Sequence, residues 1–233
     1  MRTDRTPHER RRALMMRRAR VRLLAVMICL VCASAPAQDY VPVNLQLLTA
    51  ARAGDLAAVQ RLLGDGAAIN SRNRLGETAL MVAIKRGHDA MASWLLEHGA
   101  DVKQANLVGV TPLMAAAFDG KVELARLLLE RGADAQAVDR VHKPAMVYAA
   151  GNGHTAIVAL LLDRGVDANQ RYPGDQTALM WAAGFNHGET ADLLLARGAD
   201  ATVRDDRGWT AAQQARANGH NAIAARLEAP RSQ

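Results

Sequence analysis

Glycine, alanine and leucine recur through this sequence at a fixed interval of 33 residues. A second glycine series, an alanine series and a leucine series begin at Gly66, Ala50 and Leu62 and keep that interval without one insertion or deletion. The first glycine series has one gap, which asparagine fills: Gly54, Gly87, Gly120, Gly153, Asn186, Gly219. Six copies in register predict a stack of structural repeats, because a copy of this length cannot bury its apolar face alone.

Each copy has the pattern of a pair of short helices. A threonine such as Thr111 opens the copy, where its hydroxyl can accept from a free backbone N–H, and Pro112 suits the first helical turn. The first helix ends at a glycine, which tolerates the left-handed conformation, and the second helix carries a leucine pair inward to the next glycine. The scarcity of aromatic residues, 3% of the chain, suits helices packed through alanine and leucine.

The motifs resemble those of the ankyrin repeat family over about residues 39–229. The resemblance rests on Thr111-Pro112-Leu113, on Gly87-His88 and on Gly99-Ala100-Asp101, with matching residues in the other copies. It implies an all-α solenoid of about six helix-turn-helix repeats joined by hairpin-like fingers. We expect the repeat domain at 38–229, with repeats at about 40–72, 73–105, 106–138, 139–171, 172–204 and 205–229, and a tail at 230–233.

Some positions depart from the family pattern. The histidine expected after Thr-Pro-Leu is absent, and its column reads Met81, Met114, Val147, Met180, Gln213. Pro144 stands in a threonine place, which removes the expected side-chain cap of that helix. The first copy lacks the Thr-Pro opening and the last carries Gln213 and Gln214 at mostly apolar positions, so we interpret both as capping repeats around four full ones.

The first 37 residues have a different character. Nine arginines precede an eleven-residue apolar run, 23–33, which is shorter than the roughly 20 residues of a membrane span. A basic stretch, a short apolar run and then Ala35-Pro36-Ala37 are typical of a secretory signal peptide, so we predict cleavage after Ala37. Alternatives are an uncleaved anchor or a disordered basic tail. If translation began at Met15 or Met16 instead of Met1, the signal peptide would have a more usual length.

Cysteine and charge narrow the possible functions. Both cysteines, Cys29 and Cys32, lie in the apolar run, so the cleaved chain would have no thiol for catalysis, disulfides or metal binding. The whole chain has a net charge of +6, and residues 1–37 alone have a net charge of +7. The rest of the chain therefore has a net charge of −1. A near-neutral body does not attract a phosphate backbone, so nucleic acid is not an expected partner.

Catalytic and metal-binding patterns are not found. No serine has a nucleophile setting and no glycine loop follows a strand. The histidines His88, His154, His187 and His220 recur one repeat apart, and helices that stack about 8–10 Å apart do not bring them to one ion. We expect them to hydrogen-bond the turn between the two helices. The methionine column is expected to fill the core. The sequence therefore predicts neither an enzyme nor a cofactor.

The resemblance implies that a protein partner binds the concave face, made by the finger tips and the exposed side of the first helices. The matching finger positions are Arg74, Leu75, Glu77, Leu107, Val108, Val110, Arg140, Val141, Lys143, Pro173, Gln176, Asp206, Arg207 and Trp209. The matching first-helix positions are Lys85, Arg86, Phe118, Asp119, Asn152 and Phe185.

The scarce aromatic residues point to the same face. Six of the eight fall on or beside it: Phe118, Tyr148, Tyr172, Trp181, Phe185 and Trp209. Large aromatic side chains supply much of the binding energy of interfaces. Tyr148 and Trp181 each precede paired alanines, where bulky residues also pack between repeats, so either a contact or a core role fits them.

These observations together predict a non-enzymatic, monomeric protein-binding module that acts outside the cytoplasm, in a bacterial periplasm. The membrane would be met only transiently, through the signal. Two alternatives are a secreted effector that binds a protein of another cell and a periplasmic stress protein that handles a ligand or metal.

Overall fold

The computed structural model describes residues 41–229, and these form twelve α-helices in six pairs. The first helices of the pairs are α2 (Val43–Ala53), α4 (Ala79–Arg86), α6 (Pro112–Phe118), α8 (Ala145–Gly151), α10 (Ala178–Gly184) and α12 (Ala211–Ala217). The second helices are α3 (Leu56–Gly64), α5 (Asp89–Glu97), α7 (Val122–Glu130), α9 (Thr155–Asp163), α11 (Gly188–Ala196) and α13 (Asn221–Glu228). The predicted signal peptide, the cut after Ala37 and the tail at 230–233 lie outside the described residues.

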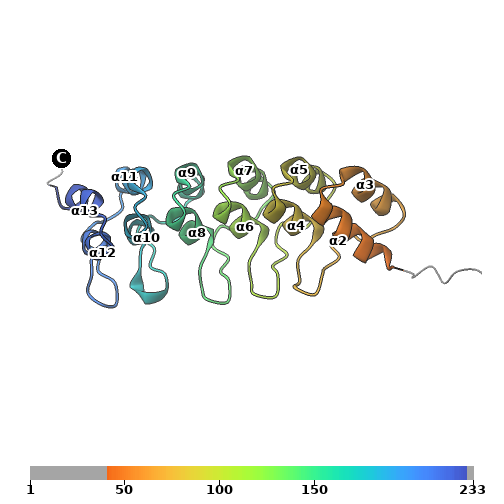
Figure 1. The fold of residues 1–233 in the computed structure, drawn as a ribbon. Helices are drawn as coiled ribbons and strands as arrows, with labels where there is room; N and C mark the ends of the chain where they lie inside the picture. The colour runs from red at the N-terminus through yellow and green to blue at the C-terminus, as the bar shows by residue number, and fades with distance from the viewer. Residues whose placement is uncertain (1–40, 230–233) are drawn as a thin grey trace, which may run out of the picture. The chain divides into compact units, whose positions relative to one another are not determined.

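The pairs stand side by side in chain order, so the first helices form one row and the second helices another (Figure 1). Five loops project beyond the row of first helices and connect each pair to the next. The alanine and leucine columns of the sequence are buried between the rows and between neighbouring pairs. This arrangement confirms the predicted all-α solenoid of helix-turn-helix repeats. Within residues 41–229 the fingers hold no β-strand, only an isolated bridge between Tyr172 and Gln176.

Threonine caps the first helix in four of the repeats, as the sequence predicts. The hydroxyls of Thr78, Thr111, Thr177 and Thr210 each accept from the backbone N–H three residues on. Helix α8 has Pro144 as its N-cap residue and has no side-chain cap, which confirms the expected loss. The methionine column adds a contact that the sequence did not predict, because the sulfurs of Met114 and Met180 accept from the N–H of the capping threonines at 3.4 and 3.5 Å.

The glycines that end the helices adopt the left-handed conformation. The series from Gly54 to Gly219 has φ between 69 and 83°, and Asn186 in the same series has φ 66°. The second series, which follows the second helices, has φ between 80 and 93°. Both series therefore sit where a side chain with a Cβ is disfavoured, and the asparagine is the expected replacement.

A third column with positive φ lies at the tips of the fingers, at Gly76, Gly109, His142, Asp175 and Gly208. We expect His142→Gly to raise the free energy of unfolding by about 0.5 kcal/mol, because glycine relieves the left-handed strain of His142 at φ 59°. Urea unfolding followed by circular dichroism measures it. Asp175→Gly is the matched comparison and should raise the free energy of unfolding less, since aspartate tolerates the left-handed conformation. An unchanged or lowered stability of His142→Gly would contradict the strain argument.

The histidine column joins neighbouring repeats. The Nε2 atoms of His88, His154 and His187 lie 3.3, 2.9 and 3.0 Å from the carbonyl oxygens of Arg52, Phe118 and Gly151. Each acceptor lies at or beside the end of the preceding first helix, so the expected hydrogen bond to the turn exists but crosses to the previous repeat. Two places differ. Lys121 replaces a histidine and pairs with Asp89 at 3.0 Å, and Asn218 rather than His220 donates to the Gly184 carbonyl.

The last repeat differs from the expected polar cap in one position. Gln213 is exposed, and its amide oxygen accepts from the N–H of Thr210 at 2.9 Å. Gln214 is buried and donates to Asp205, so its expected place on a polar outer face is wrong. The polar residue is tolerated there because it satisfies a carboxylate in the last finger.

Candidate functional site

An asparagine or aspartate anchors four of the five fingers. In each of these fingers one side-chain oxygen accepts from the backbone N–H two residues on and from the N–H four residues on, at 2.8–3.0 Å. The four anchors recur at the 33-residue interval or its double: Asn73, Asn106, Asp139, Asp205. This closed turn holds the residues at each finger tip in a fixed position next to the first helices.

The two aspartate anchors are buried, and each has a partner nine residues on. The Tyr148 hydroxyl donates to Asp139, and the Gln214 amide donates to Asp205 at 2.9 Å. Asp205 also pairs with Arg207 at 2.7 Å. Burial alone would raise the pKa of Asp205, but hydrogen bonds from Trp209, Arg207 and Gln214 outweigh it and lower the pKa. Burial and the bond to Asp139 raise the pKa of the Tyr148 hydroxyl.

The finger at 171–176 lacks this anchor, because Tyr172 stands in its place. Tyr172 is 7% exposed, and within the described residues its hydroxyl and the indole nitrogen of Trp181 have no hydrogen-bond partner. A 3₁₀ turn, η1 (Pro173–Asp175), shapes this finger instead, and a backbone bond from Tyr172 to Gln176 closes it at 2.8 Å. The aromatic ring of Tyr172 belongs to the core and not to the exposed face on which the sequence suggested it.

Most of the predicted contact residues lie on one surface, which we call the finger face. It consists of the finger tips (72–77, 105–110, 138–143, 171–176, 204–209) and the exposed parts of the first helices and their C-caps. The exposed predicted residues are Arg74, Leu75, Lys85, Arg86, Leu107, Val108, Phe118, Asp119, Arg140, Val141, Asn152, Pro173, Phe185, Asp206, Arg207 and Trp209. The half-buried ones are Val110, Lys143, Tyr148, Gln176 and Trp181.

Like Tyr172, Glu77 was predicted on the exposed face and is buried, with 5% of its surface exposed. Its carboxylate pairs with Lys85 at 2.5 Å and accepts from Asn73 at 2.9 Å. Burial would raise the pKa of Glu77, but these two side chains outweigh it and lower the pKa. Its expected place on the exposed face is therefore wrong. Glu77 supports the finger at 72–77 and holds Lys85, because a buried charge needs a partner.

A hollow of about 280 Å³ lies over the third repeat, and we call it the third-repeat hollow. It is lined by Lys85, Asn106, Val108, Val110, Met114, Ala115, Phe118, Asp119 and Tyr148. The rings of Phe118 and Tyr148 meet edge to face with centroids 6.0 Å apart, which fixes one wall. The hollow lies between a finger and a first helix and has a mostly apolar lining.

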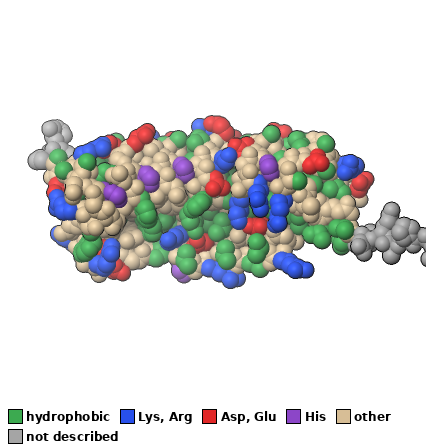
Figure 2. Space-filling view, viewed as in Figure 1, with side chains coloured by type: hydrophobic (Ala, Val, Ile, Leu, Met, Phe, Trp, Pro, Cys, Tyr) green, Lys and Arg blue, Asp and Glu red, His purple; other side chains and the backbone are tan. Residues whose placement is uncertain are grey.

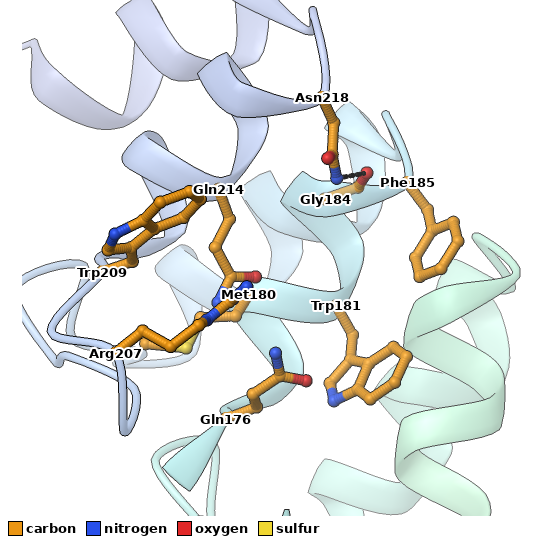
Figure 3. A pocket seen from close by; sticks show the side chains of 9 residues that line it. All are labelled: Gln176, Met180, Trp181, Gly184, Phe185, Arg207, Trp209, Gln214 and Asn218. Atoms are coloured by element: carbon orange, nitrogen blue, oxygen red, sulfur yellow. Dashed lines mark hydrogen bonds between the residues drawn. The ribbon is translucent and has the colours of Figure 1, made fainter. Parts of the chain in front are cut away.

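A second hollow, of about 210 Å³, lies over the fifth and sixth repeats, and we call it the fifth-repeat hollow. Its lining comprises Gln176, Met180, Trp181, Gly184, Phe185, Arg207, Trp209, Gln214 and Asn218. Figure 3 shows Trp181 and Phe185 on α10 at one side and Trp209 and Arg207 in the last finger at the other. The rings of Trp181 and Phe185 stack with centroids 5.9 Å apart, and the guanidinium of Arg207 lies 4.8 Å from the Trp209 ring.

Tyr148 and Trp181 combine the two roles that the sequence left open. Each is half-buried and packs against the core, and each also lines a hollow. Lys143 lies 4.5 Å above the Trp181 ring.

The sequence did not predict four of the residues that line these hollows: Arg52, Met114, Met180 and Asn218. Their place in the 33-residue columns could have suggested them, since they are equivalent to positions that line the face in other repeats.

The described residues offer binding surface but no assembled chemistry. Among residues 41–229, no three His, Cys, Asp or Glu side chains lie close enough together to hold a metal ion. No helix in that range is long and apolar enough to cross a bilayer. The site is therefore a line of hollows, mostly apolar over the third repeat and of mixed lining over the fifth, with cationic side chains at their edges.

Comparison with known proteins supplies the family. No curated protein matches the chain. The family model that describes three copies of the ankyrin repeat matches residues 47–139 and 136–205. These ranges cover the helices from α2 to α11, and the structure adds one further pair of the same kind, α12 and α13. The fold and this match together show that the chain belongs to the ankyrin repeat family.

Proposed function

We propose that this protein is a non-enzymatic, monomeric binding module whose finger face holds a protein partner outside the cytoplasm. Ankyrin repeats generally mediate protein–protein interaction. Support for this face comes from one observation on residues 41–229. The large hydrophobic residues that stay exposed lie in the finger tips, in a first helix or its C-cap, or next to them, and none lies on a second helix. Such a concentration marks a contact surface on a water-soluble domain.

The aromatic residues carry most of the expected binding energy. Phe118 is 53% exposed, Phe185 56% and Trp209 39%, and each borders a hollow. Side chains of this size that are buried on binding commonly cost more than 1 kcal/mol each when truncated. Trp94 is the only aromatic residue on a second helix among residues 41–229, where it stacks on His98 with ring centroids 3.7 Å apart.

We expect the triple variant Phe118→Ala, Phe185→Ala, Trp209→Ala to capture its partner at least tenfold less than the parent chain. The measurement is an affinity capture from an extract of the source cells with the full chain, tagged at its C-terminus. Trp94→Ala is the matched control and should capture as the parent does. Circular dichroism must show both variants folded. Equal capture by the triple variant and the parent would reject the finger face as the binding surface.

The proposed location rests on the basic and apolar pattern of residues 1–37. N-terminal sequencing of the protein isolated from its cells tests it. A chain that begins at Gln38 supports export through a cleaved signal, and an intact N-terminus in the cytoplasmic fraction rejects it.

A further inference from the structure

The finger face carries a net positive charge that residues 41–229 as a whole do not. Residues 41–229 contain 19 Lys and Arg and 20 Asp and Glu, a net charge of −1. The finger tips, first helices and their C-caps hold 11 of these cations but only 6 of the acids, so this part of the repeat domain has a net charge of +5. The second helices and adjoining turns have the balancing −6. The near-neutral net charge of residues 41–229 is therefore the sum of a basic binding face and an acidic back.

Three cations of the finger face that have no carboxylate partner lie close together at one end of it. Arg52, Lys85 and Arg86 line a hollow of about 310 Å³ over the second repeat, which we call the second-repeat hollow. Arg74 lies in the neighbouring finger and shares a hollow with Arg52. Within the described residues, no carboxylate pairs with Arg52, Arg74 or Arg86, whereas Lys85 is held by Glu77. Figure 2 shows blue side chains clustered over α2 and α4, beside hydrophobic ones at the level of the first helices.

The other end of the face carries the aromatic rings of Trp181, Phe185 and Trp209 beside polar side chains. The third-repeat hollow and the fifth-repeat hollow follow the second-repeat hollow in chain order along the row of first helices. In the fifth-repeat hollow the cation Arg207 is already paired with Asp205. The finger face is thus graded from free cations to rings.

We propose that the partner of the finger face is an extended acidic segment with two large apolar side chains. Its carboxylates would lie on Arg52, Arg74 and Arg86, one apolar side chain in the third-repeat hollow and the other in the fifth-repeat hollow. This inference rests on the proposed binding function and adds the chemistry, order and spacing of the ligand. The chain's own first 40 residues do not match, because they hold nine arginines and only three acids.

The spacing follows from the geometry of the stack. Neighbouring packed helices are about 10 Å apart, so the third-repeat and fifth-repeat hollows are about 20 Å apart. An extended chain advances about 3.3 Å per residue, so the two apolar side chains should be about six residues apart. The second-repeat hollow is about one repeat from the third, which places the acidic residues about three residues from the nearer apolar one.

A random peptide library of about 14 residues, displayed on phage and selected on the full chain, tests this at low ionic strength. We expect enriched sequences with clustered Asp or Glu at one end and two large apolar residues about six positions apart. Dye-labelled enriched peptides should bind Arg52→Glu, Arg86→Glu about tenfold more weakly than the parent by fluorescence anisotropy. The matched control makes the same change in net charge at two exposed arginines of the back, Arg61→Glu and Arg131→Glu, and should bind nearly as well as the parent.

The outcomes separate this inference from the proposed function. Enriched peptides that are neutral or basic, or acidic ones that the Arg52 and Arg86 reversal does not weaken, would overturn the acidic segment. The second result would place acidic peptides on the arginines of residues 1–22. Failure to enrich any peptide would also overturn the acidic segment. The capture experiment with the aromatic triple variant would still test whether the finger face binds a partner. Concentration-dependent self-association that the Arg52 and Arg86 reversal abolishes, measured by sedimentation, would assign the face to the acidic back of a second copy.

Discussion

Gly120→Ala is expected to lower the free energy of unfolding by about 2–3 kcal/mol, whereas Gly132→Ala should lower it by about 1 kcal/mol. Both glycines are left-handed, with φ 69 and 80°, so the backbone strain of an alanine is similar at the two positions. They differ in their neighbours. A Cβ on Gly120 would lie 2.6 Å from the His154 ring, and a Cβ on Gly132 would meet nothing within 4 Å. The extra cost at Gly120 comes from displacing that ring.

The displaced ring would lose its hydrogen bond to the Phe118 carbonyl, which it makes at 2.9 Å across the junction of two repeats. A double-mutant cycle isolates this contribution. In a His154→Ala background the ring is gone, so Gly120→Ala should cost about as little as Gly132→Ala. Urea unfolding of the four proteins provides the free energies. Equal costs of Gly120→Ala with and without His154 would show that the histidine column does not couple the repeats.

The 33-residue interval predicts which positions are equivalent, and this is enough to derive most of the fold. It predicts the six helix pairs, the threonine caps and the left-handed Asn186 without reference to any neighbour. Those features depend on the backbone of a single copy. The burial of the alanine and leucine columns follows as soon as the copies are stacked.

Features that depend on a neighbouring copy or on a distant finger residue were not predictable in this way. The interval places His154 near a turn but does not say that its acceptor lies in the preceding repeat. Glu77 was predicted on the exposed binding face and Gln214 on a polar outer face of the last repeat. Both are buried, because one neighbour has the complementary group, Lys85 or Asp205. Position equivalence therefore predicts the backbone better than the side-chain pairs on the finger face.

The candidate face shows the same division. Its exposed finger tips follow from the repeat pattern, because each tip occupies an equivalent place in successive copies. Among the aromatic residues only Tyr148 and Trp181 share such a column. The hollows and the grading of charge do not, since they arise between a finger and the helix of the same or the next repeat. Tyr172 illustrates the limit, because one substitution in the anchor column turns an expected contact residue into a core residue.

Asp205→Ala is expected to lower the free energy that holds α12 and α13 on the stack by about 3 kcal/mol. The substitution removes a buried acceptor of hydrogen bonds from the N–H groups of Arg207 and Trp209 and from Gln214. Bonds to a charged group contribute about 1.5–3 kcal/mol, and the buried Gln214 amide is left without its partner. Because a terminal repeat contacts one neighbour only, the loss should appear first as local opening. Hydrogen exchange of amides in α12 and α13, compared with those in α8 and α9, measures it.

The same carboxylate should make the last repeat sensitive to acid. Its pKa is lower in the folded chain than the ordinary value of 3.8, so the unfolded chain binds more protons. The stabilisation is therefore fully present above about pH 4 and is lost as the pH falls through the folded pKa. Asp205→Asn is the matched control, because Asn73 and Asn106 anchor two other fingers in the same turn. At pH 7, Asp205→Asn should lower the stability of the last repeat less than Asp205→Ala does. The opening of α12 and α13 should also increase less steeply with falling pH in Asp205→Asn than in the parent. An equally steep acid dependence in Asp205→Asn would assign that sensitivity to another group.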